Sequence, residues 1–268
     1  MLQPLPMQPP DVELAAPGSD EDAARADLWG LLALLFIAPP SQQVLSHLAG
    51  KLGACRALVV ESENGPQRGQ FLPDLQAHSP AMGQKAGEKW TAAAHLQPTI
   101  PKPDRLLAAE NAAGSALQLA WSHLLSTAAA VTPEEVLDEF ESLFGGTGRP
   151  AVYVYGSFYL AGALHEKPVA RLRADLQDIG LARRIELGES EDHFAILAET
   201  MRFLIAGDDP AVCNLTRQRD LFQRHIQPWG AQMCDAIEGD HAARFYRAVA
   251  GFTREFLQVE QMAFDLLD

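Results

Sequence analysis

The sequence predicts an all-α protein that forms a single helical-bundle domain with one irregular insert. Apolar residues recur at helical spacing over most of the chain, and capping signals separate the helical stretches. Alanine and leucine dominate where a β protein would carry valine, isoleucine and threonine. The chain has 268 residues, which is long enough to bury a substantial core. Neither an internal repeat nor an alternation of strands and helices is visible.

The charge and cysteine content exclude several classes of function. A formal net charge of −14 argues against nucleic acid as a partner, because phosphate contacts need clustered lysine and arginine. Cys55, Cys213 and Cys234 lie far apart, so they indicate neither a disulfide framework nor a zinc site. Residues 1–18 predict a disordered tail that lacks the basic start of a signal peptide. The longest apolar run, Leu28–Ala38, is too short to span a bilayer, so we expect a cytoplasmic protein without stable membrane insertion.

The N-terminal part predicts two helices followed by an irregular segment. Ser19 is suited to cap a helix that ends at Pro39-Pro40, and a second helix follows Ser41. From Gly53 to Pro103 the apolar residues keep no steady period, and proline, glycine and glutamine are frequent. We therefore expect a poorly ordered insert at 53–103, with one short helix near residues 82–95.

The remainder of the domain, which we place at 19–268, predicts further helices. Thr132, Pro133 and Glu135 form the pattern of a capping box with proline in the first turn. Tyr153–Leu160 has the composition of a strand, and we interpret it as an extended connector that enters a helix near Ser157. Helical periodicity is found in several other stretches, at 104–130, 168–179, 190–206, 215–226, from Pro228 onward and at Phe245–Val259.

The densest polar cluster is Glu189–His193, and it allows several interpretations. Structurally, Ser190 would cap a helix with acidic residues in its first turn. Asp192 and His193 would point about 100° apart on a helix, so they do not form a catalytic dyad. Glu189 and His193 supply at most two metal ligands. In an exposed first turn, Asp192 could instead accept a charge-assisted hydrogen bond from a cationic partner.

Two further motifs have a structural and a functional interpretation. Gly145–Gly148 is rich in glycine, but it follows a helix and runs into Arg149-Pro150, whereas a phosphate-binding loop follows a strand. A helix C-terminus and turn explain it better. Phe140, Leu143 and Phe144 form an apolar stripe on one helix face, which is either core or a binding surface.

Four elements resemble, in order, the signatures of the TorD/DmsD/NarJ family of molybdoenzyme-specific (redox enzyme maturation) chaperones. The run Glu139–Gly148 resembles the family's aromatic-x-x-Leu-Phe-x-Gly-x-Gly motif, and Tyr155–Leu160 is similar to its Gly-Ser-x-Tyr-Leu element. Glu189–His193, with Glu199-Thr200-Met201, is similar to Glu-Pro-x-Asp-His and a downstream Glu-x-Met. Phe222–Trp229 is similar to Phe-x-x-His-x-x-x-Trp.

The resemblance covers Trp121–Leu267 and Ala23–Leu52, but not 53–103. Ser190 stands where the family usually has proline, and Val154 stands where a proline commonly precedes the aromatic-Gly-Ser element. Both departures bear on the shape of the client-binding groove more than on the fold.

The resemblance implies a chaperone without cofactor, metal or catalytic residues. Its members bind the twin-arginine signal peptide and the apo form of a molybdoenzyme catalytic subunit before export, and some form domain-swapped homodimers. The resemblance and the charge of such a signal together imply a set of client-binding residues, namely Phe140, Leu143, Phe144, Tyr155, Ser157, Glu189, Asp192 and His193.

Two alternative functions stay open, and one further resemblance bears on the identity of the client. One is a NarJ-type assembly factor whose client is not exported. Another, from a different class, is a helical metal-dependent hydrolase using His193, Asp192 and Glu189. The client itself is indicated by His165–Pro168 and Leu172–Leu176, which resemble members found beside formate dehydrogenases.

Overall fold

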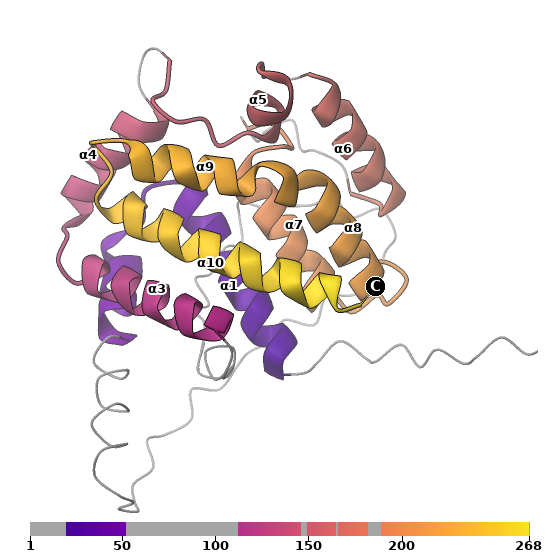
Figure 1. Cartoon of the computed structure of the whole chain (residues 1–268), viewed down its shortest axis with the longest axis horizontal. Coiled ribbons are helices and arrows are strands. Elements are labelled where there is room, and N and C mark those ends of the chain that lie inside the picture. Colours follow the sequence, from indigo (N-terminus) through magenta and orange to yellow (C-terminus); the bar gives the residue numbers. More distant parts are fainter. Residues whose placement is uncertain (1–19, 52–111, 146–148, 165, 182–188, 268) are drawn as a thin grey trace, which may run out of the picture.

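Figure 1 shows a computed structural model, in which residues 20–51, 112–145, 149–164, 166–181 and 189–267 are described. The expected N-terminal tail, the insert at 53–103 with its short helix, and the cap at Ser19 lie outside these ranges. Within them the regular structure is helical, and the one β-type pairing is an isolated antiparallel bridge between Tyr155 and His193. The predicted all-α fold is confirmed.

The helices follow the predicted periodic stretches closely. Besides a helix at residues 42–51, they are α1 (Asp20–Ile37), α3 (Ala112–Ala128), α4 (Pro133–Phe144), α5 (Gly156–Ala161), α6 (Lys167–Asp178), α7 (Phe194–Ala206), α8 (Leu215–His225), α9 (Gln227–Gly239) and α10 (Phe245–Asp265). Over the described residues, no helix is both long and apolar enough to cross a membrane.

Two sets of packed helices make up the bundle (Figure 1). The first pairs α1 with α7, and the second places α10 against α3 and α9. The short helix α5 packs on α6 and α9, and α8 joins α7 to α9. The core between them contains the largest fully buried side chains, among them Trp29, Trp121, Trp229, Tyr246 and Phe252.

Helix α1 is buried on nearly all sides. Leu28, Leu32 and Phe36 lie at i, i+4 and i+8 on one inward face of the helix, and all three are buried. Trp29 and Ala33, however, are also almost completely buried. A helix that is apolar around most of its circumference belongs in the interior of a bundle rather than at its surface.

The predicted capping box is present at the start of α4, and a glycine closes the end of α6. At α4 the Thr132 hydroxyl accepts from the amide of Glu135 at 3.2 Å, and the Glu135 carboxylate accepts from the amide of Thr132 at 2.9 Å. Gly180 follows α6 with φ of 76°, a conformation that L side chains rarely adopt. The amide of Leu181 then donates to the carbonyl of Leu176 at 2.8 Å, which closes the helix end.

A carboxylate from α4 caps α10, more than 100 residues later in the chain. Glu139 accepts from the backbone amides of Arg244 at 2.8 Å, Phe245 at 3.0 Å and Tyr246 at 2.7 Å. The N-cap residue of α10 offers no side-chain hydrogen bond of its own. Glu139 therefore accepts hydrogen bonds from amides that have no partner within α10, and its charge lies at the positive end of the dipole of α10.

We expect Glu139→Ala to lower the free energy of unfolding by about 2–4 kcal/mol, because buried amides lose their acceptor. Denaturant titration against Glu141→Ala measures this, since Glu141 lies on the same helix with an exposed side chain. Equal stability of the two variants would show that the cap contributes nothing.

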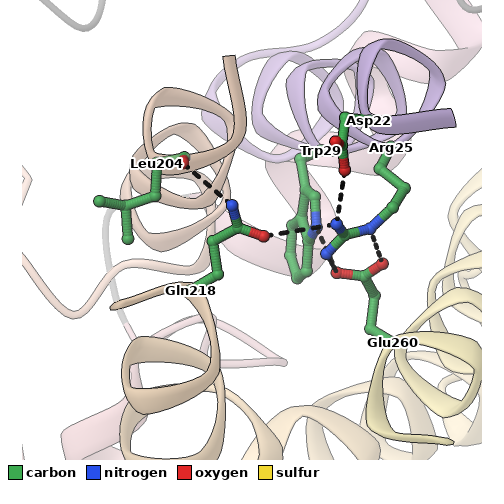
Figure 2. Close-up of polar contacts among 6 residues, drawn as sticks. All are labelled: Asp22, Arg25, Trp29, Leu204, Gln218 and Glu260. Atoms are coloured by element: carbon green, nitrogen blue, oxygen red, sulfur yellow. Dashed lines mark hydrogen bonds and ion pairs between the residues drawn. The ribbon is translucent and has the colours of Figure 1, made fainter. Parts of the chain in front are cut away.

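A buried ion pair joins the first described helix to the last (Figure 2). Arg25 on α1 donates to both carboxylate oxygens of Glu260 on α10, at 2.7 and 2.9 Å, and Trp29 donates to the same carboxylate at 3.1 Å. Glu260 is 1% exposed. Gln218 on α8 accepts from Arg25 at 3.3 Å and donates to the carbonyl of Leu204 on α7 at 3.1 Å. The network thus links α1, α7, α8 and α10.

We expect Arg25→Ala and Glu260→Ala each to destabilise the protein by about 3–5 kcal/mol, because each leaves its partner buried without compensation. The double variant should lose about 1–3 kcal/mol less than the sum, and chemical denaturation of all four proteins gives that coupling. Arg224→Ala serves as the surface control, since Arg224 is 58% exposed and pairs with Asp220 at 3.4 Å; it should cost no more than about 1 kcal/mol. Strictly additive losses at Arg25 and Glu260 would refute the coupling.

Candidate functional site

Two of the segments with family-like motifs lie against each other. The amide of Gly156 donates to the carbonyl of Asp192 at 3.0 Å, and the amide of Phe194 donates to the carbonyl of Val154 at 2.8 Å. These bonds pair an extended stretch with the turn before α7. The expected connector is therefore present, and α5 begins at Gly156, one residue before the expected Ser157.

Gly156 brings α5 into close contact with α9. A Cβ atom at this position would lie 2.9 Å from the indole nitrogen of Trp229, closer than real Cβ contacts. The ring of Tyr159 on α5 stacks on that of Trp229, with centroids 5.6 Å apart. A residue without a side chain is thus needed at the glycine of the Gly-Ser element, because the helix lies directly on a buried tryptophan.

Asp192 is buried, which corrects the expectation of an exposed carboxylate. It is 3% exposed, and its Oδ2 accepts from the amide of Ser157 at 2.8 Å. It thereby caps α5, whose own N-cap residue Tyr155 makes no side-chain capping bond. Its Oδ1 and the hydroxyl of Ser190 are both buried without a hydrogen-bond partner in the described part of the chain. Such groups are uncommon in folded proteins.

His193, and not Ser190, caps α7. The helix begins at Phe194, and Nδ1 of His193 accepts from the amide of Ala195 at 3.1 Å. Ser190 lies instead at the start of a turn in which its carbonyl accepts from the amide of His193 at 3.0 Å. This turn directs Asp192 into the protein, so the acidic residues do not form a first helical turn.

The imidazole of His193 is held neutral. Burial lowers its pKa to about 4, although the charges of Glu189 and Asp192 act in the opposite direction. Its ring meets that of Tyr155 edge to face, with centroids 5.0 Å apart. Nδ1 must be unprotonated to accept from the amide of Ala195, which agrees with a neutral ring.

Glu189 and Tyr155 form the more accessible part of this group. The Tyr155 hydroxyl donates to the Glu189 carboxylate, and both residues are partly exposed. Burial, followed by the hydrogen bond and the charge of Glu189, raises the pKa of Tyr155 well above its ordinary value of 10.0. Tyr155 therefore remains a donor and holds the carboxylate in place.

Phe140, Leu143 and Phe144 form a second group. Leu143 is completely buried, whereas Phe140 and Phe144 are partly exposed and pack on Tyr246, with centroids 5.8 and 5.0 Å away. Phe36 contacts Phe144 and also Phe194, the residue after His193. Buried aromatic rings thus connect the two groups.

Glu189, Asp192 and His193 each have a separate partner. These partners are the Tyr155 hydroxyl, the Ser157 amide and the Ala195 amide. In the described parts of the chain, no group of three or more His, Cys, Asp or Glu side chains is placed to hold a metal ion. The arrangement supports recognition by hydrogen bonding and charge.

A family model matches the segment that contains these residues, and two known proteins match parts of the chain. Residues 110–235 match the family model of the nitrate reductase delta subunit. A stretch of 135 residues is 27% identical to "Chaperone protein TorD" of Aliivibrio fischeri, over 47% of this chain and 62% of that protein. Another of 77 residues is 35% identical to an uncharacterized protein of Haemophilus influenzae, over 29% of this chain and 40% of that protein. The chain is thus similar to the TorD/NarJ family over these segments.

The two matches span 62% of the length of the Aliivibrio fischeri protein and 40% of the length of the Haemophilus influenzae protein. The family-model match includes α3 to α8 and most of α9, and therefore both groups of site residues. The motifs that the sequence shares with the TorD/NarJ family thus fall in the matched region, whereas α1 and α10 lie outside it.

Two interactions between distant segments could not be predicted from the sequence. Glu191 forms a bidentate ion pair with Arg173 on α6, with both distances 2.9 Å. Nε2 of His225 lies 2.7 Å from Asp175. Neither pair is close in sequence, so no local signal predicts them. The cap at Glu139 could have been predicted in part, because Glu139 is a charged residue on the buried face of α4, between Val136 and Leu143.

We expect His193 to make stability depend on pH. Its pKa is about 4 in the folded protein against 6.5 for an ordinary histidine, so the unfolded chain binds a proton that the folded chain does not. Stability is therefore unaffected above pH 6.5 and falls as the pH decreases toward 4, by roughly 3 kcal/mol in total.

Denaturant titrations of wild type and His193→Asn across this range measure the effect. Asparagine is a good N-cap that does not titrate, so the variant should lose less stability on acidification. Parallel curves for the two proteins would show that His193 is not the group responsible.

Proposed function

We propose that this protein is a cytoplasmic chaperone that binds the twin-arginine signal peptide and the apo form of a molybdoenzyme catalytic subunit, and assists its maturation before export. The proposal rests on the match to the family model of the nitrate reductase delta subunit and on the identity shared with a protein named Chaperone protein TorD. In this role the protein is a binding protein and not an enzyme. A formate dehydrogenase is the client we would test first.

The cationic pair of such a signal needs accessible carboxylates. Glu189 is partly exposed and held by Tyr155, which makes it the best placed acceptor among the candidate residues. Asp192 acts differently from the sequence expectation: it fixes the start of α5 and so positions Tyr155 from within the protein. The net charge of −14 attracts a cationic segment over longer distances.

The apolar stretch of the signal needs an apolar surface next to that carboxylate. Leu137, Phe140 and Phe144 lie at i, i+3 and i+7 on α4 and share one side of the helix. Leu137 is 41% exposed, and both phenylalanines are partly exposed. We propose this stripe as the apolar part of the client surface, while Leu143 belongs to the core.

A second candidate is a NarJ-type assembly factor for a client that is not exported. The description of the matching family model, nitrate reductase delta subunit, favours it. The two functions differ in the client segment that is bound, which is a twin-arginine signal in one case and a mature N-terminus in the other. Affinity capture from the native cells, followed by sequencing of the client's N-terminus, distinguishes them.

We expect Glu189→Gln to weaken binding of a synthetic peptide with two adjacent arginines and an apolar stretch by roughly tenfold, because a charge-assisted hydrogen bond is lost. Glutamine still accepts from Tyr155, so the thermal midpoint should stay near that of wild type. Glu255→Gln on α10 removes the same charge elsewhere. Isothermal titration calorimetry of the three proteins gives the affinities.

Peptide controls separate a specific site from general attraction to an acidic protein. Replacing both arginines by glutamine should abolish binding to wild type. Replacing them by lysine should weaken binding, because lysine lacks the planar guanidinium group that can donate two parallel hydrogen bonds to a carboxylate. If Glu189→Gln and Glu255→Gln reduce affinity equally, the effect is one of net charge and the site is misplaced. If the client captured from cells contains no molybdoenzyme subunit, the proposed function is wrong.

A further inference from the structure

A pocket of about 430 Å³ is lined by residues of α5, α6, α8 and α9, none of which belongs to either group of site residues. It is lined by Leu160, Pro168, Arg171, Asp175, Arg224, His225 and Pro228. Ligand pockets typically enclose about 300–1,000 Å³. The volume therefore suits a small organic molecule, or one side chain with its neighbours.

The pocket is electropositive in a protein that is otherwise strongly acidic. Its lining residues include two arginines and a single aspartate. Pro168 and Pro228 stand in the first turns of α6 and α9, and neither first turn contains an acidic residue. Because Leu160 and Arg224 stand in the last turns of α5 and α8, positive and negative helix ends meet at the pocket, and its positive charge comes from the arginines.

Both arginines can still donate hydrogen bonds. Arg171 is exposed and has no ion pair with the described residues. Arg224 is 58% exposed and reaches Asp175 at 3.6 Å and Asp220 at 3.4 Å. Charge-assisted bonds are normally about 2.7–2.9 Å long, so these contacts leave the guanidinium largely unsatisfied.

The rest of the wall is apolar and rigid. Leu160 is 42% exposed, although it is a large apolar side chain. The two prolines have fixed backbones. Asp175 holds the His225 ring at 2.7 Å, and the His225 carbonyl accepts from Trp229 at 2.6 Å. A wall that is already ordered loses little conformational freedom when a ligand binds.

We infer that this pocket binds an organic carboxylate: the anion lies between Arg171 and Arg224, and an apolar body packs on Leu160, Pro168 and Pro228. A guanidinium fork matches the planar carboxylate group. The two arginines repel a cationic signal peptide, so this ligand differs from the client proposed above. The inference stands independently of the chaperone function.

Isothermal titration calorimetry with phenylbutyrate tests the site. The affinity should be in the millimolar range or tighter. Phenylbutylamine, which has the same apolar body and the opposite charge, should give no binding, and inorganic phosphate should bind more weakly because it lacks that body. Absence of phenylbutyrate binding, or equal binding of the amine, overturns the inference.

Matched variants locate the binding. Arg171→Gln and Arg224→Gln should each weaken phenylbutyrate binding about fivefold and together abolish it. Arg217→Gln, two turns from Arg224 on α8, should leave phenylbutyrate binding unchanged. Leu160→Ser should weaken the binding about threefold, whereas its control Leu119→Ser should have no effect. All five side chains are at least partly exposed, so the variants should keep the wild-type thermal midpoint. Equal affinity of the double arginine variant and wild type overturns the assignment.

Discussion

The bidentate pair between Arg25 and Glu260 is the contact on which the arrangement of the bundle depends. The two residues are 235 positions apart in sequence, on α1 and α10. Gln218 connects the pair to α8 and, through the carbonyl of Leu204, to α7. Apolar packing alone is tolerant of small rotations between helices, because leucine and alanine surfaces fit in several ways. A buried charge pair has only one satisfied geometry, so it fixes the relative orientation of α1 and α10.

The site depends on a second set of directional contacts. Two backbone hydrogen bonds pair the stretch before α5 with the turn before α7, and Asp192 and His193 cap the helices that follow. Two helix starts are therefore built from one short turn. Glu189 and Tyr155 lie at the accessible edge of this turn, and the aromatic residues of α4 connect to it through Phe36. The candidate recognition residues are thus supported by a structural element that is itself buried.

The helices could be predicted from the sequence because their signals are local. The capping box at Thr132, the glycine at 180 and the apolar periodicity of α10 each involve residues within one or two turns. The start of α7 was wrongly predicted at Ser190 because the prediction could use only such local signals. A serine followed by two acidic residues has the local pattern of a helix start, but the partner of Asp192 is Ser157, 35 residues earlier.

The candidate site and the pocket were predicted only in part. The resemblance selected Tyr155, Glu189 and His193, which do lie together, but it could not tell exposed from buried carboxylates. The pocket combines side chains from α5, α6, α8 and α9, and each is unremarkable on its own helix. Its charge becomes apparent only when the helices are assembled, because two arginines 53 residues apart then face one cavity.

The cap at Glu139 has a consequence for the order in which the chain folds during synthesis. Its three amide partners are translated more than 100 residues after α4. Tyr246, on which Phe140 and Phe144 pack, arrives at the same late stage. Contacts between residues so distant in sequence form slowly, because a long loop must close first. A nascent chain that lacks α10 therefore presents a loose apolar helix, and the aromatic surface of α4 acquires its final shape in one of the last steps of folding.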